Sequence, residues 1–371
     1  MLHPKIKILS VVGARPNFVK IAPFLRELEK HPSFRSVLLH TGQHYAEKLS
    51  SSFFAELKIK KPKYNLEVGS LSHAQQTAEV MRLIEPIFIK EKASLIILVG
   101  DVNSTLAAGL VAVKLQIPTA HIEAGLRSLK MSMPEEVNRR LVDHISNYLF
   151  CTEPIAVKNL RKENIKKGVY LVGNLMIDSL LDKVDCLQNL HPNFNLPFKK
   201  YALLTLHRPS NVDDFNTLSK WVNIFQKVSY KIPIIFPIHP RTDLLLKKYK
   251  LKEKLRKNGR CLLLEPLTYE QNLKLMQTAT LVLTDSGGIQ QESTLLNVPC
   301  LTLREETELL ITCREGSNTL VGQNEKKILL LIDQILLGKY KKFRTPKLWD
   351  GRAAERIVEI LKNDLCVASM A

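Results

Sequence analysis

The sequence has no long apolar run. No uncharged stretch reaches the roughly 20 residues that a membrane-spanning helix needs, and the opening MLHPKIK lacks the apolar core of a signal peptide. We therefore expect a cytoplasmic protein with no membrane partner.

Cysteine is scarce, and none of the six cysteines forms a Cys-x-x-Cys pair. They are Cys151, Cys186, Cys261, Cys300, Cys313 and Cys366. This spacing indicates neither a zinc site nor a disulfide framework. We expect reduced, mostly buried cysteines and no metal.

Acidic residues are few beside basic ones, at 36 against 54, which gives a formal net charge of +18. Such a balance could favour nucleic acid. However, the densest basic run, residues 247–257, is typical of the solvated face of a helix, and no nucleic-acid motif or aromatic platform accompanies it. We expect no nucleic-acid partner. The 371 residues, 45% of them hydrophobic, suffice for two core-forming domains.

The stretch from Thr280 to Leu296 predicts a strand, a turn and a helix. An apolar run stops at Asp285, and a helical pattern begins after Gly287-Gly288. The N-terminus of such a helix suits phosphate, Ser286 adds a hydroxyl donor, and Glu292 could accept hydrogen bonds from a ribose diol. An ordinary strand-to-helix turn with its N-cap is the alternative.

In the first half, polar residues follow strands that are typical of a parallel sheet. Arg15 follows the run 6–12, Asp101 follows the continuous apolar run 95–99, and Glu123 ends the short run from Thr119. Since parallel strands deliver their carboxyl ends to one edge, the two acids should lie in the same crevice, suited to acid–base chemistry. Arg15 suits a pyrophosphate, or is simply a surface loop arginine.

Glu135 has two interpretations. It has capping-box spacing from Ser132, with Pro134 near the first helical position, so it could cap a helix. It could also join Asp101 and Glu123 as a catalytic acid if the units are wound regularly. The two functions are compatible.

The second half repeats the strand-and-helix pattern. His207 follows the strand 201–206 and His239 follows the strand 234–238, with Arg208 and Arg241 close by in sequence. A single histidine is more often structural, but this repeated placement at strand ends favours a ligand-binding function.

Together these patterns predict an α/β protein with two Rossmann-like, doubly wound domains that face a cleft. We place the first domain, with the catalytic acids, at 1–174 and the second, binding the nucleotide, at 175–350. The last segment, 351–371, should be a helix that packs back on the first domain.

Eight motifs in order carry a resemblance to a known family. They are VVGARPNFVKIAP (11–23), TGQHY (41–45), GDVNSTLA (100–107), HIEAGLRS (121–128), MPEEVNRR (133–140), LTLHRPSNVDD (204–214), PIHPRT (237–242) and LTDSGGIQQES (283–293). From about Lys5 to Leu361 the chain resembles the non-hydrolysing UDP-N-acetylglucosamine 2-epimerases, which have a glycosyltransferase-B type of fold.

The resemblance implies reversible inversion at carbon 2 of the sugar, without nicotinamide or any other cofactor. A base removes the C2 proton while UDP departs, a 2-acetamidoglucal forms, and UDP adds back after protonation on the other face. The residues that match the catalytic positions are Asp101, Glu123, Glu135 and His207. Which acid serves which face stays open.

The resemblance also implies binding residues and partners. Those expected to hold the UDP-sugar are Arg15, Lys20, Ser286, Gly287, Gly288 and Glu292. Positions where some bacterial members bind a second UDP-sugar as an activator are matched by Gln43, His44, Glu136, Arg208 and His239. Family members commonly form homodimers and serve surface polysaccharide biosynthesis.

Two departures from the family pattern bear on these expectations. Leu309 and Leu310 replace the usual Arg-Pro, which removes a basic residue near the phosphate region, and Ala46 replaces a glutamine found in activated members. The alternatives are a 2-epimerase of a modified UDP-sugar such as a diacetamido uronic acid, a hydrolysing 2-epimerase, a glycosyltransferase of the same fold, and a non-catalytic nucleotide-sugar binder.

Overall fold

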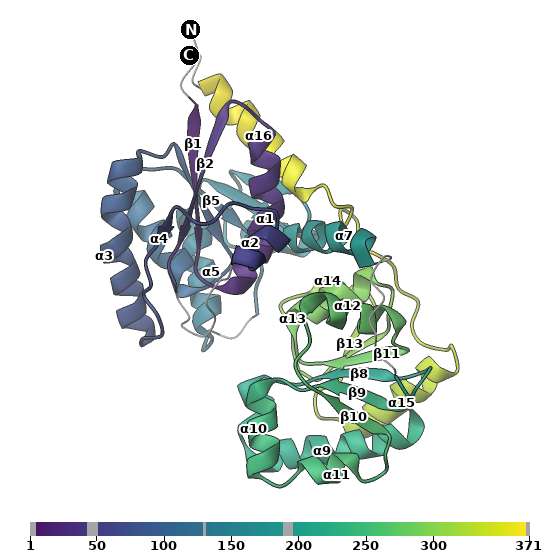
Figure 1. The fold of residues 1–371 in the computed structure, drawn as a ribbon. Helices are drawn as coiled ribbons and strands as arrows, with labels where there is room; N and C mark the ends of the chain where they lie inside the picture. The colour runs from purple at the N-terminus through teal and green to yellow at the C-terminus, as the bar shows by residue number, and fades with distance from the viewer. Residues whose placement is uncertain (1–4, 43–50, 129–130, 188–195, 369–371) are drawn as a thin grey trace. The chain divides into compact units, whose positions relative to one another are not determined.

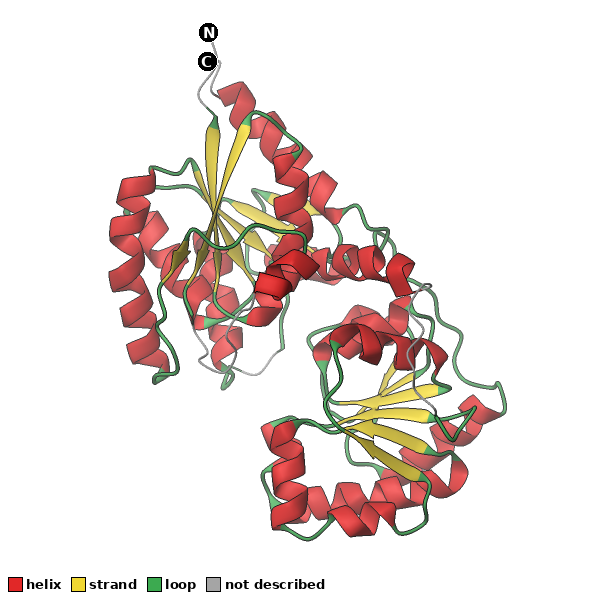
Figure 2. Cartoon of the chain, viewed as in Figure 1, coloured by secondary structure: helices red, strands yellow, loops and turns green. Residues whose placement is uncertain are grey.

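The computed structural model describes residues 5–42, 51–128, 131–187 and 196–368 (Figures 1 and 2). The chain divides into two compact units. Unit 1 comprises residues 1–181 and 347–371, and unit 2 comprises residues 182–346. The C-terminal segment therefore belongs to unit 1.

Unit 1 contains a parallel sheet that has seven strands within the described residues, in the order β3-β2-β1-β4-β5-β6-β7. The strands are β1 Ile6–Val12, β2 Phe34–His40, β3 Tyr64–Asn65, β4 Leu95–Val99, β5 Thr119–Ile122, β6 Tyr148–Cys151 and β7 Val169–Leu171. The strand order reverses between β1 and β4, so their carboxyl ends flank a topological switch point, where open α/β sheets bind ligands.

Helices cover both faces of this sheet (Figure 2). They are α1 Arg15–Glu29, α2 Ser51–Glu56, α3 His73–Glu91, α4 Asn103–Lys114, α5 Pro134–Ile145, α6 Pro154–Lys162, α7 Leu175–Leu187 and α16 Ala353–Ala368. All five residues of β4 are buried, as expected for a central parallel strand whose two faces are both covered.

The last helix, α16, lies beside α1 (Figure 1). Its residues Ile357, Val358 and Leu361 are fully buried in the same core cluster as Phe18. The backbone N–H of Ala354 also donates to Asp178. Apolar burial therefore joins the two ends of the chain into one core.

Unit 2 contains a second parallel sheet, with six strands in the part that the structure describes, in the order β10-β9-β8-β11-β12-β13. The strands are β8 Ala202–Thr205, β9 Ile234–Pro237, β10 Cys261–Leu264, β11 Leu281–Thr284, β12 Cys300–Thr302 and β13 Asn318–Leu320. The helices are α8 Pro209–Val212, α9 Phe215–Lys231, α10 Pro240–Lys248, α11 Lys252–Arg256, α12 Tyr269–Thr278, α13 Gly287–Leu295, α14 Leu310–Arg314 and α15 Glu325–Leu336. Here the switch point lies between β8 and β11.

The fold class predicted from the sequence is confirmed, since both units are doubly wound parallel α/β structures. The interpretation of 247–257 as one helical face was wrong. Lys250 has φ +55°, in the left-handed region, so α10 ends at Lys248 and α11 begins at Lys252. Buried Leu251 and Leu255 anchor the second short helix.

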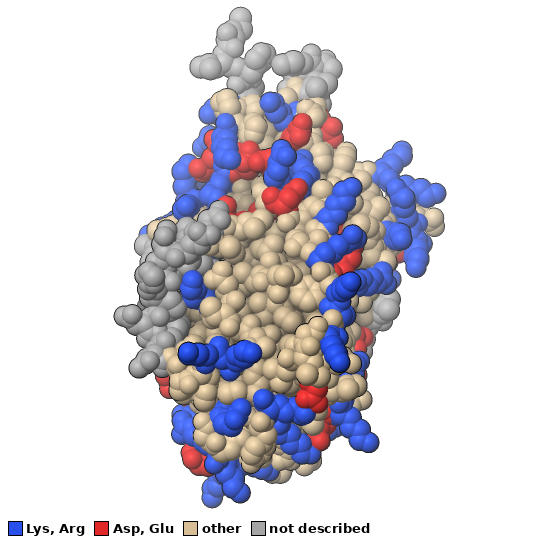
Figure 3. Space-filling view, turned by 90° about the vertical axis from the view of Figure 1, so that its right-hand side faces the viewer, with Lys and Arg blue, Asp and Glu red and all other residues tan. Residues whose placement is uncertain are grey.

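Basic side chains do not gather into one stripe on the face seen in Figure 3, where acidic side chains are interspersed at several places.

Of the described cysteines, Cys151, Cys261 and Cys300 are buried, and all five with described side chains are free. No helix of the described segments is long and apolar enough to cross a membrane.

Candidate functional site

The carboxyl ends of β4 and β5 bring two predicted acids together around one lysine. The Lys20 ammonium lies 2.6 Å from Oε2 of Glu123. Burial opposes the charge on Lys20, but Glu123 and Asp101 together raise its pKa above the usual value. The three side chains thus form one electrostatic group, as expected for neighbouring strand ends.

Gly100 lets these side chains approach closely. It has φ +68°, and a Cβ there would lie 3.3 Å from Nδ2 of Asn17, 3.6 Å from Oε2 of Glu123 and 3.8 Å from Nζ of Lys20. The Asn17 amide in turn donates to the Val99 carbonyl, which links α1 to the end of β4. The positive φ favours glycine here, and an added Cβ would also be tight against the Asn17 amide.

Asp101 is held from α5. Nη2 of Arg139 donates to its carboxylate at 2.6 Å, and the Asn138 amide donates to its backbone carbonyl at 2.9 Å. Its side chain is 28% exposed, so the carboxylate is fixed in place and still accessible. These are the properties required of a proton-transfer group.

Glu135 lies in the first turn of α5 and is half-buried. The N-cap of this helix is Met133, without a side-chain cap, so the capping box from Ser132 was a wrong prediction. Within the described residues, no hydrogen bond or ion pair joins Glu135 to Asp101 or Glu123. Its catalytic function stays a prediction.

Some predicted residues cannot be placed. Gln43, His44 and the side chain of Arg15 lie outside the described part of the structure. The backbone of Arg15 is described, and it forms the first residue of α1 instead of lying in the predicted turn.

Glu136, a predicted activator residue, is fully buried. Its carboxylate accepts hydrogen bonds from the Ser128 N–H at 2.9 Å, Arg139 Nη1 at 3.1 Å and Arg140 Nε at 3.0 Å. This satisfied environment gives Glu136 a structural function. A ligand would have to replace one of these donors to reach it.

In unit 2, the buried carboxylate of Asp285 organises the ends of β8 and β11. It accepts from the backbone N–H groups of His207 and Arg208, at 3.0 and 2.8 Å, and from the Asn211 amide at 3.1 Å. Burial opposes its charge, but His207 and these donors hold the pKa of Asp285 below its usual range. Asp285 therefore fixes the histidine–arginine turn next to α13.

The two predicted histidines lie together, with ring centroids 5.4 Å apart. Nδ1 of His207 is 3.1 Å from Asp285, and the His207 side chain is 38% exposed. Partial burial and then His207 lower the pKa of His239. The Arg241 guanidinium pairs with Asp213 at 2.5 Å, while its backbone N–H donates to Nδ1 of His239 at 3.2 Å.

The N-terminus of α13 is formed by Ser286, Gly287 and Gly288, as predicted. Ser286 is the N-cap, but its side chain makes no cap hydrogen bond. A Cβ on Gly287 would lie 3.4 Å from Oε1 of Glu308 and 3.7 Å from Cδ1 of Leu309. The altered segment therefore lies directly beside this helix end.

Arg304 lies five residues before Leu309. Its Nη2 donates to Glu308 at 3.1 Å, while its Nη1 is buried with no partner in the described structure. Burial opposes the charge of Glu308, but Arg304 and Arg208 hold the pKa of that carboxyl below its usual value. Two arginines thus supply positive charge next to α13.

Glu292 is the most perturbed acid of the predicted set. It is 5% exposed, and its Oε2 has no hydrogen-bond partner among the described residues. Burial raises its pKa to about 7, against a smaller opposing effect of the Tyr269 hydroxyl. Such a buried, incompletely satisfied carboxylate is typical of a ligand site and unusual in a structural core.

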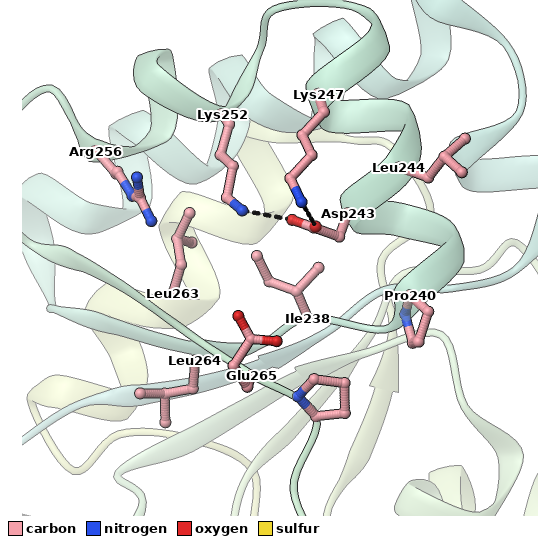
Figure 4. Close-up of a pocket in the computed structure, with 11 residues that line it drawn as sticks. Ile238, Pro240, Asp243, Leu244, Lys247, Lys252, Arg256, Leu263, Leu264 and Glu265 are labelled. Atoms are coloured by element: carbon pink, nitrogen blue, oxygen red, sulfur yellow. Dashed lines mark hydrogen bonds and ion pairs between the residues drawn. The ribbon is translucent and has the colours of Figure 1, made fainter.

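A hollow of unit 2, of about 400 Å³, lies at the ends of β9 and β10 (Figure 4). Asp243 on its wall pairs with Lys247 and Lys252, both at 2.6 Å, and these hydrogen bonds lower the pKa of Asp243. Its walls contain none of the predicted site residues.

Sequence reasoning missed several residues that hold the site. They are Asn17, His121, Asn138, Arg139, Asp143, Asn211, Asp285, Arg304 and Glu308. Most of them stand inside the quoted motifs, beside the residues that were chosen. No group of three or more potential metal ligands occurs in the described segments.

A family model described as UDP-N-acetylglucosamine 2-epimerase matches residues 26–362. The chain belongs to this family of isomerases.

Individual relatives are similar over nearly the whole chain. A UDP-N-acetylglucosamine 2-epimerase of Methanocaldococcus jannaschii is 42% identical, covering 96% of this chain and 99% of the relative. A UDP-2,3-diacetamido-2,3-dideoxy-D-glucuronate 2-epimerase of Pseudomonas aeruginosa is 36% identical over 96% of this chain and 99% of its own length. The crystal structure of the Methanocaldococcus jannaschii UDP-GlcNAc 2-epimerase with UDP-GlcNAc and UDP has a TM-score of 0.84 and 41% identity, covering 96% of this chain and 99% of that one.

Proposed function

We propose that this enzyme reversibly converts UDP-N-acetylglucosamine to UDP-N-acetylmannosamine by eliminating UDP and adding it back. The observation that carries the proposal is the group formed by Lys20, Asp101 and Glu123 at the ends of β4 and β5. Inversion at C2 requires proton transfer on two faces of the sugar, and this group provides two carboxylates within reach of one ammonium.

The groups of unit 1 have complementary environments. Glu123 is 12% exposed and paired with Lys20, whereas Asp101 is 28% exposed and paired with Arg139. A carboxylate can accept the C2 proton, and each of these two is held in position by a cation. The cation retains the proton-transfer group in position while the 2-acetamidoglucal forms. Glu135 is proposed as a third acid of this chemistry.

Unit 2 contributes the groups that hold UDP. The glycine-rich start of α13 is proposed to bind the diphosphate through Ser286, Gly287 and Gly288. Arg15 of unit 1 is proposed separately as a residue that binds the UDP-sugar. Arg304 supplies the charge that Leu309 no longer provides. Glu292 accepts the ribose hydroxyls, and His207 stabilises or protonates the departing phosphate.

The test is proton NMR of the purified enzyme with UDP-N-acetylglucosamine in deuterated water. The expected result is the UDP-N-acetylmannosamine epimer with deuterium at C2. Free N-acetylmannosamine with UDP would indicate a hydrolysing enzyme. A reaction that requires an added acceptor would indicate a glycosyltransferase.

A diacetamido uronic acid sugar nucleotide is the second candidate substrate, supported by the 36% identity to the Pseudomonas aeruginosa relative. The two candidates are distinguished by supplying both sugar nucleotides at equal concentration. The preferred substrate is the one with the higher kcat/KM.

We further propose that the enzyme is a cytoplasmic homodimer that serves surface polysaccharide synthesis. We also propose that it has an activator site for a second UDP-sugar. The activator site draws on Gln43, His44, Arg208 and His239, and not on Glu136, whose carboxylate is satisfied inside unit 1. A lag in the reverse reaction that a trace of UDP-N-acetylglucosamine removes would reveal activation. Light scattering of the purified protein measures the oligomeric state.

A further inference from the structure

His121 is a fully buried histidine in the middle of β5, two residues before Glu123. Its Nε2 lies 2.8 Å from the carbonyl oxygen of Gly100, and its Nδ1 lies 2.7 Å from Oδ1 of Asp143. The ring therefore connects α5 to the end of β4 across the sheet. The residue at that strand end is Asp101.

The partners determine the protons on the ring. A carbonyl oxygen can only accept, so Nε2 carries a hydrogen. Nδ1 faces Oδ1 of Asp143, while Oδ2 of that carboxylate accepts from the Gly125 N–H at 3.0 Å and from Arg127 at 2.7 Å. The ring is therefore oriented by Asp143 and presents its Nε2–H to the Gly100 carbonyl.

The His121 ring belongs to a network of hydrogen bonds and ion pairs. Arg127 contacts both Asp143, at 2.7 Å, and Glu163, at 2.6 Å. Burial opposes the charge of Asp143, but His121 and Arg127 keep its pKa below the usual value. The ring is thus fixed on one side by an ion-pair network and on the other presents one N–H to Gly100.

The bond to Gly100 fixes the peptide unit that leads into Asp101. The Gly100 N–H donates to Ile122 at 3.1 Å, and its carbonyl is taken by His121, so both polar groups of this glycine are occupied. Asn138 holds the next carbonyl, that of Asp101 itself. A left-handed glycine has wide conformational freedom, and these bonds select one direction for the Asp101 side chain.

We propose that His121 is a positioning residue for the epimerisation, which acts through the Gly100 carbonyl to set the direction of Asp101. This inference rests on the proposed function of Asp101. His121 itself touches no reacting atom. It also links the two acids, since β5 carries the ring and Glu123 directly follows this strand.

Two substitutions separate positioning from mere packing. The amide nitrogen of glutamine reaches the place of Nε2, so His121→Gln keeps the hydrogen bond to the Gly100 carbonyl and loses the hydrogen bond to Asp143. The amide of asparagine reaches the place of Nδ1, so His121→Asn keeps the bond to Asp143 and leaves the Gly100 carbonyl without a donor. Exposed His144 on α5 provides the matched control, His144→Asn.

The expected result is a fall in kcat of roughly 10- to 100-fold for His121→Asn, with KM and UDP affinity within about twofold of the original chain. His121→Gln should retain kcat within about threefold, and His144→Asn should match the original. Equal losses in the two variants at position 121, or a loss that appears in KM or UDP affinity, would overturn the proposal. So would failure of either variant to fold, because the ring would then be structural.

A double-mutant cycle completes the test. Because His121 acts through Asp101, adding His121→Asn to Asp101→Asn should lower the residual kcat by less than about twofold. A full additional loss would show that His121 acts elsewhere. If Asp101→Asn alone leaves kcat unchanged, the proposed function of Asp101 fails, and this outcome is visible without any variant of His121.

Discussion

The raised pKa of Glu292 leads to a specific prediction about nucleotide binding. With a pKa of about 7, this side chain is roughly one tenth ionised at about pH 6 and nine tenths ionised at about pH 8. Ribose hydroxyls donate to the carboxylate and not to the acid's own O–H. We therefore expect the contribution of Glu292 to the UDP association constant to rise about tenfold across this range.

Isothermal titration of UDP is the assay. UDP itself loses a phosphate proton at about pH 6, which also changes affinity. Glu292→Gln reports that background, so the ratio of the two association constants isolates the carboxylate. At intermediate pH the original chain should also release more protons than the variant when UDP binds. This release makes the measured heat of binding depend on the ionisation enthalpy of the buffer.

The same pKa predicts an opposite effect on the stability of the ligand-free protein. Between about pH 4.5 and 7 the folded chain retains a proton that the unfolded chain has lost, so the stability due to Glu292 is present at low pH and lost as pH rises. The shift corresponds to about 3 kcal/mol. At about pH 8, Glu292→Gln should therefore melt at a higher temperature than the original chain while binding UDP more weakly.

Two results would refute this reasoning. One is a ratio of association constants that does not change with pH. The other is a variant that melts below the original chain at about pH 8, which would mean that Glu292 is ionised and satisfied in the ligand-free protein.

Three further predictions concern other groups. Asp101→Asn should lower kcat by 10²- to 10⁴-fold, an order-of-magnitude range, with UDP affinity nearly unchanged; steady-state kinetics and titration of UDP would expose a wrong assignment if kcat survives. Gly100→Ala should cost roughly 1 to 3 kcal/mol of stability, measured by denaturant unfolding, because its φ is +68° and its Cβ would crowd Asn17; full stability and activity would contradict this strain. Leu309→Arg should strengthen UDP binding several-fold, as titration at two salt concentrations would measure, since it adds a cation beside Gly287 to that of Arg304; unchanged or weaker binding would contradict this prediction.

Much of the fold was predictable because parallel strands leave a plain signal. The apolar run at residues 95–99 is β4 to the residue, since a strand buried on both faces has no polar alternation to obscure it. The two-residue strand β3 gave no such signal, because so short a pairing depends on its neighbour β2. The break between α10 and α11 at Lys250 was also missed, since nothing in the sequence indicates that this lysine adopts a left-handed backbone conformation.

The candidate site was predictable where a residue stands at a strand end. Asp101, Glu123 and His207 are of this kind, and the strand order brings the two acids to one lysine. The supporting residues were not predictable, because a function such as that of Asp285 or Asn138 depends on contacts across the sheet. Glu136 shows the converse, since its motif position suggests a ligand contact while its contacts are internal.

The packing of α16 against α1 has a consequence for how this chain is made. A ribosome completes residues 182–346, which form unit 2, before the helix that closes unit 1 exists. The core that Ile357, Val358 and Leu361 later complete stays open until α16 has left the ribosome. Unit 1 is therefore begun before unit 2 but completed after it. While its core is open, unit 1 exposes apolar surface, and this is the stage of biosynthesis most exposed to aggregation.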